Sequence, residues 1–239
     1  MKKTIIVLLA AIMALSVVGC TNRNSNSESS GEGSFKNASV GDVIKFGRYE
    51  QDNDPSNGKE NIEWIVLAKK RNSVLVISKY ALDYQRYNMS YTDVTWETCS
   101  LRRWLNRTFL NEAFSAEEQN RIQSSAVAAD KNPSYGTPPG NKTTDKVFLL
   151  SIAEADSYFG SDEARKCAPT AYAIAQSAYA DDSDAEDDSA LCWWWLRSPG
   201  EDSFIAANVD IDGSVYTLGL SVFDDDVAVR PALWLDLTS

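Results

Sequence analysis

The chain has 239 residues, of which 44% are hydrophobic and 10% aromatic, so it has enough apolar surface to fold instead of remaining disordered. It carries 34 Asp and Glu against 23 Lys and Arg, a formal net charge of −11, which argues against nucleic acid as a partner because such binding needs a basic face. Histidine is absent, which removes the commonest general base, the commonest metal ligand and the Ser-His-Asp triad.

The first 20 residues join a short basic start to an apolar run and a cysteine. Lys2 and Lys3 precede the apolar run over residues 5–18, which leads to Cys20. This order is typical of a signal peptide that ends at a lipidated cysteine, and the run is too short to span a membrane comfortably. We predict a signal peptide over residues 1–19 and a lipid on Cys20 that anchors the protein to the outer face of a bacterial cell membrane. The alternatives are an ordinary secretory leader and an uncleaved membrane anchor.

The next segment differs in composition from the rest of the chain. Residues 21–39 are rich in Ser, Asn, Gly and Glu and contain one aromatic residue, so they cannot bury enough apolar surface to fold. We predict that residues 20–39 are the lipidated cysteine and a disordered tether. A single domain is expected over residues 40–239.

The body opens with strands and continues with helices. Short β-branched and apolar runs at 40–51, 62–70 and 73–80 are bounded by turn residues and predict strands, the last two in a hairpin. Capping boxes of the form Ser-x-x-Glu predict helix starts at Ser115 and Ser151. Before them, a helix with one apolar face is predicted by the spacing of Leu101, Trp104, Leu105 and Thr108.

The second half returns to strands after two irregular stretches. Residues 128–145 form a Pro- and Gly-rich loop, long enough to suggest an exposed functional or mobile segment, and residues 181–189 are acidic. Strands are predicted within 192–200, 204–220 and 227–237, and Asp212-Gly213 is a hairpin turn in the middle one. The order of strands, helices and strands indicates an α+β fold in which both ends of the chain share a sheet.

The chain resembles an uncharacterised bacterial family, domain of unknown function 6273, found in surface lipoproteins. The resemblance runs from about Val40 to Leu237 and is carried by residues 100–122, 147–159, 194–200 and 229–235. It implies a fold similar to C-type lectins and formylglycine-generating enzymes, with small twisted antiparallel sheets flanked by helices and long loops that present a ligand. The resemblance implies no known activity.

Two departures from those relatives limit what the resemblance implies. The Glu-Pro-Asn and Trp-Asn-Asp signatures of calcium-dependent lectins are missing, and no cysteine pair lies close together along the C-terminal half. Cys99, Cys167 and Cys192 lack a histidine to activate them and are interpreted as structural thiols. They could form one disulfide with a free thiol or remain three buried free cysteines.

The candidate ligand-binding residues are Trp193, Trp195 and Arg197. Alternation along a strand sends these three to one face and Trp194 and Leu196 to the other, which is the better candidate for the core. The first face would then present aromatic and cationic groups to a sugar ring or an anion. The alternative is that the tryptophans fill the core and that Arg197, like Arg230, pairs internally with a carboxylate.

The acidic run offers weak calcium candidates in Asp182, Asp184 and Glu186, but its spacing does not match an EF-hand and a solvated loop is the simpler interpretation. No catalytic constellation stands out. We therefore expect a non-catalytic recognition domain for a glycan or an extracellular protein, without a cofactor. The alternatives are a relative of formylglycine-generating enzymes and a purely structural envelope protein.

Overall fold

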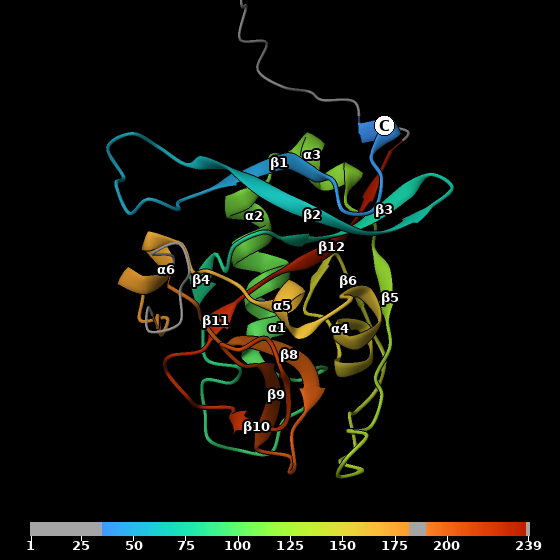
Figure 1. Ribbon diagram of the computed structural model, residues 1–239, viewed down its shortest axis with the longest axis vertical. Coiled ribbons are helices and arrows are strands. Elements are labelled where there is room, and N and C mark those ends of the chain that lie inside the picture. The colour runs from blue at the N-terminus through green and yellow to red at the C-terminus, as the bar shows by residue number, and fades with distance from the viewer. Residues whose placement is uncertain (1–34, 182–189, 238–239) are drawn as a thin grey trace, which may run out of the picture. The chain divides into compact units, whose positions relative to one another are not determined.

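The computed structural model describes residues 35–181 and 190–237, which form a mixed α/β structure of several small sheets and short helices (Figure 1). The first sheet has the order β1-β2-β3-β12-β7, and every neighbouring pair is antiparallel. The last strand lies beside the third, so both ends of the described chain share one sheet, as expected. The strands are β1 (Val43–Tyr49), β2 (Glu60–Lys70), β3 (Ser73–Ser78), β7 (Val147–Phe148) and β12 (Ala232–Asp236).

The second sheet has the order β10-β9-β8-β11-β4 and lies toward the bottom of Figure 1. Its pairs are antiparallel except for β8 with β11. A two-stranded sheet is formed by β5 (Ser125–Val127) and β6 (Thr143–Asp145), so the predicted loop over residues 128–145 ends in a short strand. The strands of the second sheet are β4 (Asp83–Tyr84), β8 (Trp194–Pro199), β9 (Ile205–Val209), β10 (Val215–Ser221) and β11 (Ala228–Val229).

One stretch of helical chain covers residues 100–113, with a π-helical segment between two α-helical ones. Leu101 and Leu105, on its predicted apolar face, are fully buried. Helices α5 and α6 follow α4 along the described chain. The helical segments are η1 (Phe35–Asn37), α1 (Ser100–Trp104), η2 (Leu105–Phe109), α2 (Leu110–Ala113), α3 (Ala116–Arg121), α4 (Ile152–Tyr158), α5 (Asp162–Arg165) and α6 (Ala171–Ala175).

The capping boxes and the hairpin turn are confirmed, whereas Thr108, predicted on the apolar face of the first helix, is exposed. Both capping boxes form, at the starts of α3 and α4. Gly213 adopts a φ of +84° in the turn between β9 and β10, a conformation that a residue with a side chain rarely takes. The conformation that this hairpin turn requires therefore explains why Asp212 and Gly213 occur together at this position.

The first described residues already contact the body of the fold. The ring of Phe35 meets that of Phe46 edge-on at 6.1 Å, Ala38 is buried, and Lys69 Nζ donates to the Ala38 carbonyl at 2.7 Å. The end of the predicted tether thus packs on the first sheet, while Cys20 lies outside the described residues. Within 35–181 and 190–237, no helix is both long and apolar enough to cross a membrane.

Candidate functional site

Trp194 and Trp195 lie on opposite faces of β8, and both are fully buried. Trp194 Nε1 donates to the Arg165 carbonyl at 3.2 Å, whereas Trp195 Nε1 donates to the Gln85 carbonyl at 3.1 Å. The segment after β4 covers the face of β8 that carries Trp195, since the Tyr87 ring packs on Trp195 with 5.6 Å between centroids.

The face of β8 that carries Trp195 and Arg197 was predicted to be exposed, but both side chains are buried. The alternation of side chains along the strand correctly placed Trp194 and Trp195 on opposite faces. It could not show that a segment distant in sequence covers the face that carries Trp195. Trp193 is half-buried, with its ring 5.1 Å from that of Tyr179, and so is not an open platform either.

Arg197 is 3% exposed and pairs internally with Glu154, the carboxylate that also caps α4. Its Nη1 donates to the Leu149 carbonyl at 2.8 Å, and its Nε donates to the Ala128 carbonyl at 3.1 Å. Internal pairing was the alternative expected for this arginine. Arg230 differs, because its Nε and Nη1 atoms donate to the carbonyl oxygens of Ser78 and Arg165.

A small cleft opens beside Arg197. Its volume of about 10 Å³ is close to the least that can hold one water molecule, so it admits a small polar group and not a sugar ring. The lining residues are Trp96, Ala128, Ala129, Asp130, Pro139, Ser151, Arg197 and Ser198.

Several large apolar or aromatic side chains are exposed on β10 and on the loops beside the β9–β10 hairpin. We call this set the loop-end surface. Its side chains are between 37% and 63% exposed, although residues of this kind are usually buried. The members are Met89, Tyr91, Tyr135, Tyr216 and Phe223.

Backbone hydrogen bonds hold one loop of this surface in place. Asn88 N donates to the Val222 carbonyl at 2.7 Å, and Val94 N donates to the Ser203 carbonyl at 2.9 Å. These bonds fix residues 88–94 at the open end of the β9–β10 hairpin, opposite its turn. Met89 and Tyr91 are therefore exposed on an anchored loop.

The second loop is fixed by a buried side chain. The Nδ2 atom of Asn132 lies within hydrogen-bond distance of the Pro199, Gly200 and Thr217 carbonyls, at 2.9, 3.1 and 2.7 Å. Its Oδ1 accepts from the backbone N–H of Tyr135 at 3.2 Å. Tyr135 therefore stands beside β10, the strand that carries Tyr216.

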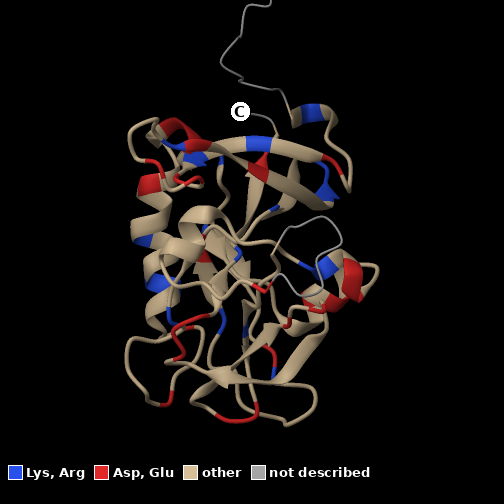
Figure 2. Ribbon diagram, turned by 60° about the vertical axis from the view of Figure 1, so that its left-hand side comes forward, with Lys and Arg blue, Asp and Glu red and all other residues tan. Residues whose placement is uncertain are grey.

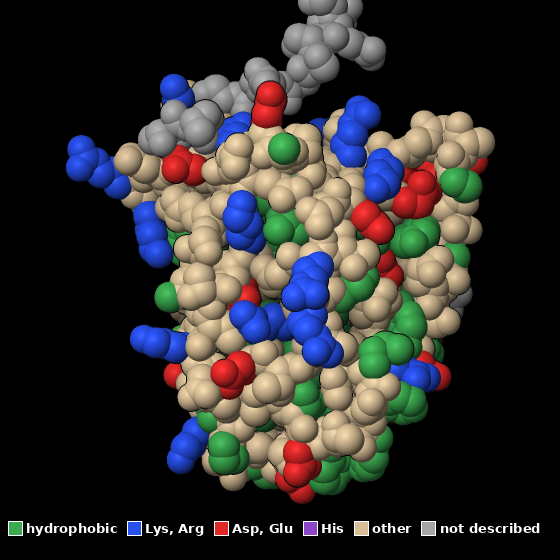
Figure 3. Space-filling model, turned by 180° about the vertical axis from the view of Figure 1, so that it is seen from behind, with side chains coloured by type: hydrophobic (Ala, Val, Ile, Leu, Met, Phe, Trp, Pro, Cys, Tyr) green, Lys and Arg blue, Asp and Glu red, His purple; other side chains and the backbone are tan. Residues whose placement is uncertain are grey.

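Polar groups lie among the exposed rings. Arg86 lies 3.8 Å from the centre of the Phe223 ring and pairs with Asp225 at 3.2 Å. Asp93 accepts from Ser203 Oγ at 2.7 Å. Figure 2 shows acidic residues along the loops at this end, and Figure 3 shows hydrophobic side chains near acidic ones at the lower edge of the opposite view. Rings that offer an apolar face beside hydrogen-bond acceptors suit an amphipathic ligand.

The sequence reasoning identified only part of this surface. The loop over residues 128–145 was singled out as exposed and functional, and it contains Tyr135. Residues 87–93 were not singled out, although Tyr-Asn-Met-Ser-Tyr-Thr-Asp combines large apolar side chains with turn-forming residues outside any predicted strand or helix.

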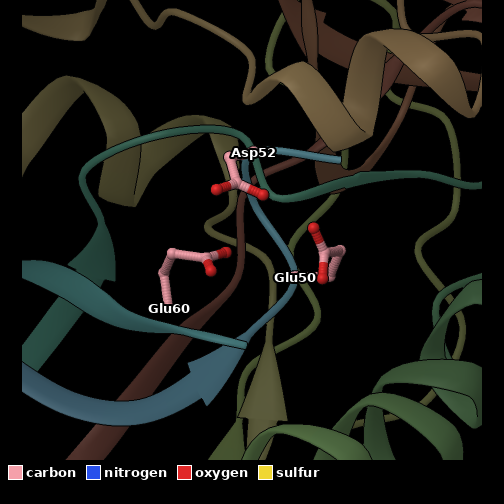
Figure 4. A group of neighbouring side chains, drawn as sticks. All are labelled: Glu50, Asp52 and Glu60. Atoms are coloured by element: carbon pink, nitrogen blue, oxygen red, sulfur yellow. The ribbon is translucent and has the colours of Figure 1, made fainter. Parts of the chain in front are cut away.

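Three carboxylates lie close together where the loop between β1 and β2 meets the start of β2 (Figure 4). Oxygen atoms of Glu50, Asp52 and Glu60 all lie within 4.8 Å of one another, as the ligands of a hard divalent cation do. They also shape the loop, because Glu60 accepts from Gln51 N at 2.8 Å and Asp52 from Asn57 Nδ2 at 2.7 Å.

Desolvation, followed by the charge of Glu60, raises the pKa of Glu50. The pKa of the neighbouring Asp52 is instead lowered, chiefly by the hydrogen bond from Asn57. The three weak calcium candidates predicted from the sequence, Asp182, Asp184 and Glu186, lie outside the described residues.

The family model described as "Domain of unknown function (DUF6273)" matches residues 71–237, more than two thirds of the chain. No curated protein and no solved structure matches the chain.

Proposed function

Because the chain belongs to the DUF6273 family, whose description names no activity, we propose a function from its geometry: a non-catalytic domain that recognises glycans through the loop-end surface. The observation that carries the proposal is the presence of exposed tyrosines on loops that are hydrogen-bonded to the scaffold. Anchored rings lose little conformational entropy on binding, so more of the contact energy appears as affinity.

A glycan fits the chemistry of this surface better than an anionic polymer does. Sugar rings have apolar faces that stack on aromatic side chains, and their hydroxyl groups donate to carboxylates such as those of Asp93 and Asp202. The net charge of −11 would repel nucleic acid and other polyanions. An extracellular protein is the second ligand class, because Tyr and Met are also enriched where proteins bind one another.

The proposed fold is C-type-lectin-like. Two small sheets with short helices, and loops gathered at one end, support this assignment as a proposal. A shared fold alone does not identify a ligand, so the proposal has to be tested by substituting the proposed binding residues.

The test is a glycan array probed with the full-length chain, followed by titration of any glycan that binds. Tyr91→Ala and Tyr216→Ala should each weaken binding about tenfold or more, as expected for a central aromatic contact. Ile174→Ala is the matched control, because Ile174 is 44% exposed on α6, outside the loop-end surface. Equal binding by all three variants, or no glycan bound by the parent chain, would contradict the proposal.

We further propose that a lipid on Cys20 anchors this domain at the outer face of the bacterial cell membrane. The support is the leader pattern, in which an apolar run ends at the cysteine. Labelled palmitate should enter the parent chain and not Cys20→Ser, and the variant should leave the membrane fraction or remain unprocessed. A processed Cys20→Ser chain that stays equally membrane-bound would contradict the lipid anchor.

A further inference from the structure

Cys167 and Cys192 are 25 residues apart in the sequence but adjacent in the fold. Cys167 follows α5 and Cys192 precedes β8, and the backbone N–H of Cys192 donates to the Cys167 carbonyl at 2.9 Å. This hydrogen bond brings the two backbones close together, and a disulfide joins residues whose α-carbons are about 4.4 to 6.8 Å apart.

Both thiol groups lie beside backbone carbonyl groups. Cys192 Sγ lies 3.3 Å from the Cys167 carbonyl oxygen, whereas Cys167 Sγ lies 3.7 Å from the Lys79 carbonyl oxygen. Both residues are buried, at 2% and 0% exposure. The two thiols are therefore buried in one region of the protein, with Cys192 Sγ directly beside the backbone of Cys167.

A buried cation lies close to this pair. Arg230 is 1% exposed and, among the described residues, forms no salt bridge with a carboxylate. Burial raises the pKa of Cys167, but the hydrogen bond with Cys192 and the charge of Arg230 lower it to a net value of about 7. Cys167 is thus the thiol of the pair that more readily becomes a thiolate, the form that attacks disulfides.

We propose that Cys167 and Cys192 form an intrachain disulfide by exchange with a small-molecule disulfide while the chain folds. The Cys167 thiolate attacks one sulfur of the donor, forms a mixed disulfide and releases the first donor thiolate, which takes up a proton. Cys192 then loses its proton and attacks Cys167 Sγ, which releases the second donor thiol. Two protein thiols are oxidised, and one donor disulfide is reduced to two thiols. An oxidising compartment outside the cytosol favours this outcome.

Cys99 provides an internal control. Its Sγ lies 3.5 Å from the Trp96 carbonyl oxygen and accepts from Arg102 N at 3.3 Å, where it caps α1. Burial raises the pKa of its thiol to about 12, so it is a poor nucleophile. The proposed bond leaves this thiol free.

The experiment uses the full-length chain with Cys20→Ser, refolded in mild detergent with oxidised and reduced glutathione or with dithiothreitol. After refolding with glutathione, denaturation should expose one free thiol in place of three, and peptide mapping should recover a Cys167–Cys192 linkage. The oxidised form should melt several degrees above the reduced form, because the bond closes a loop of about 25 residues in the unfolded chain.

Matched variants make the assignment specific. Cys99→Ser should still lose two thiols, whereas Cys167→Ser and Cys192→Ser should each keep both remaining thiols. Three free thiols in every redox buffer, or a mapped linkage that contains Cys99, would overturn the proposal. Peptide mapping of the Cys20→Ser chain decides the matter even if a further cysteine variant fails to fold.

Discussion

The same four-residue pattern starts α3 in one region of the molecule and α4 in another. At α3, Ser115 Oγ accepts from Glu118 N at 3.3 Å and Glu118 Oε2 accepts from Ser115 N at 2.8 Å. At α4, the corresponding distances between Ser151 and Glu154 are 3.2 and 3.1 Å. Each box pairs two N–H groups that would otherwise lack partners at a helix start.

The two glutamates differ in what else they bind. Glu118 Oε1 accepts from the backbone N–H of Gly47 in β1 at 3.2 Å, whereas Glu154 pairs with the buried guanidinium of Arg197. A local motif thus fixes the cap, but residues far away in sequence decide whether the carboxylate also balances a buried charge. The stability effects of equivalent substitutions should differ accordingly.

The largest expected effect follows from removing each glutamate. Glu154→Ala should lower the free energy of unfolding by about 4 kcal/mol, because it removes a cap and leaves Arg197 without its carboxylate. Glu118→Ala should cost about 1 kcal/mol, since it removes only hydrogen bonds to backbone N–H groups. Urea denaturation of both variants measures the difference.

A second background isolates the contribution of the ion pair. With Arg197→Met in place, Glu154→Ala should cost about 1 kcal/mol, close to the cost of the cap alone. An unchanged cost of Glu154→Ala in that background would show that the guanidinium does not distinguish the two regions.

The third carboxyl group is that of Asp83, which is buried like the guanidinium of Arg197 but has no cation among its hydrogen-bond donors. Asp83 accepts from the hydroxyl of Tyr49 and from Tyr84 N, and burial raises its pKa to about 6. The folded state therefore binds this proton more tightly than the unfolded state, whose pKa is near 3.9. The stabilising contribution is complete below about pH 4 and is lost as the pH rises through 6.

Asp83→Asn should remove this pH dependence. Relative to the variant, the parent chain should lose about 2 kcal/mol of unfolding free energy between pH 4 and pH 7. Urea denaturation of both chains across that range measures the difference, so the titration of other carboxylates cancels. Parallel curves would show that Asp83 does not titrate in this window.

The sequence predicted the parts of this fold that depend on neighbouring residues. Three apolar runs became β1, β2 and β3, and each Ser-x-x-Glu pattern started a helix. The burial of Trp195 could not be predicted in this way, because alternation shows which side chains share a face and not what packs on it. Residues 85–87, which lie about 110 positions earlier in the chain, provide that cover.

The functional surface was hard to predict for the same reason. Tyr91, Tyr135 and Tyr216 come from three segments that hydrogen bonds bring to one end of the molecule. The adjacency of Cys167 and Cys192 likewise depends on how the chain returns from the helices to β8. Such long-range placement leaves no periodic signal in the sequence.

The smallest expected effect tests whether the caps themselves are equivalent. Ser115→Ala and Ser151→Ala should each lower the free energy of unfolding by about 1 kcal/mol, because each leaves one helix N–H without its side-chain partner. Ser115 is exposed, so water can replace its hydroxyl, whereas Ser151 is buried and should fall at the upper end of the range. Thermal melts of the two variants and the parent chain measure this. A cost for Ser151→Ala as large as that of Glu154→Ala would mean that the cap also positions Glu154 for Arg197, so that local and distant interactions at α4 could no longer be separated.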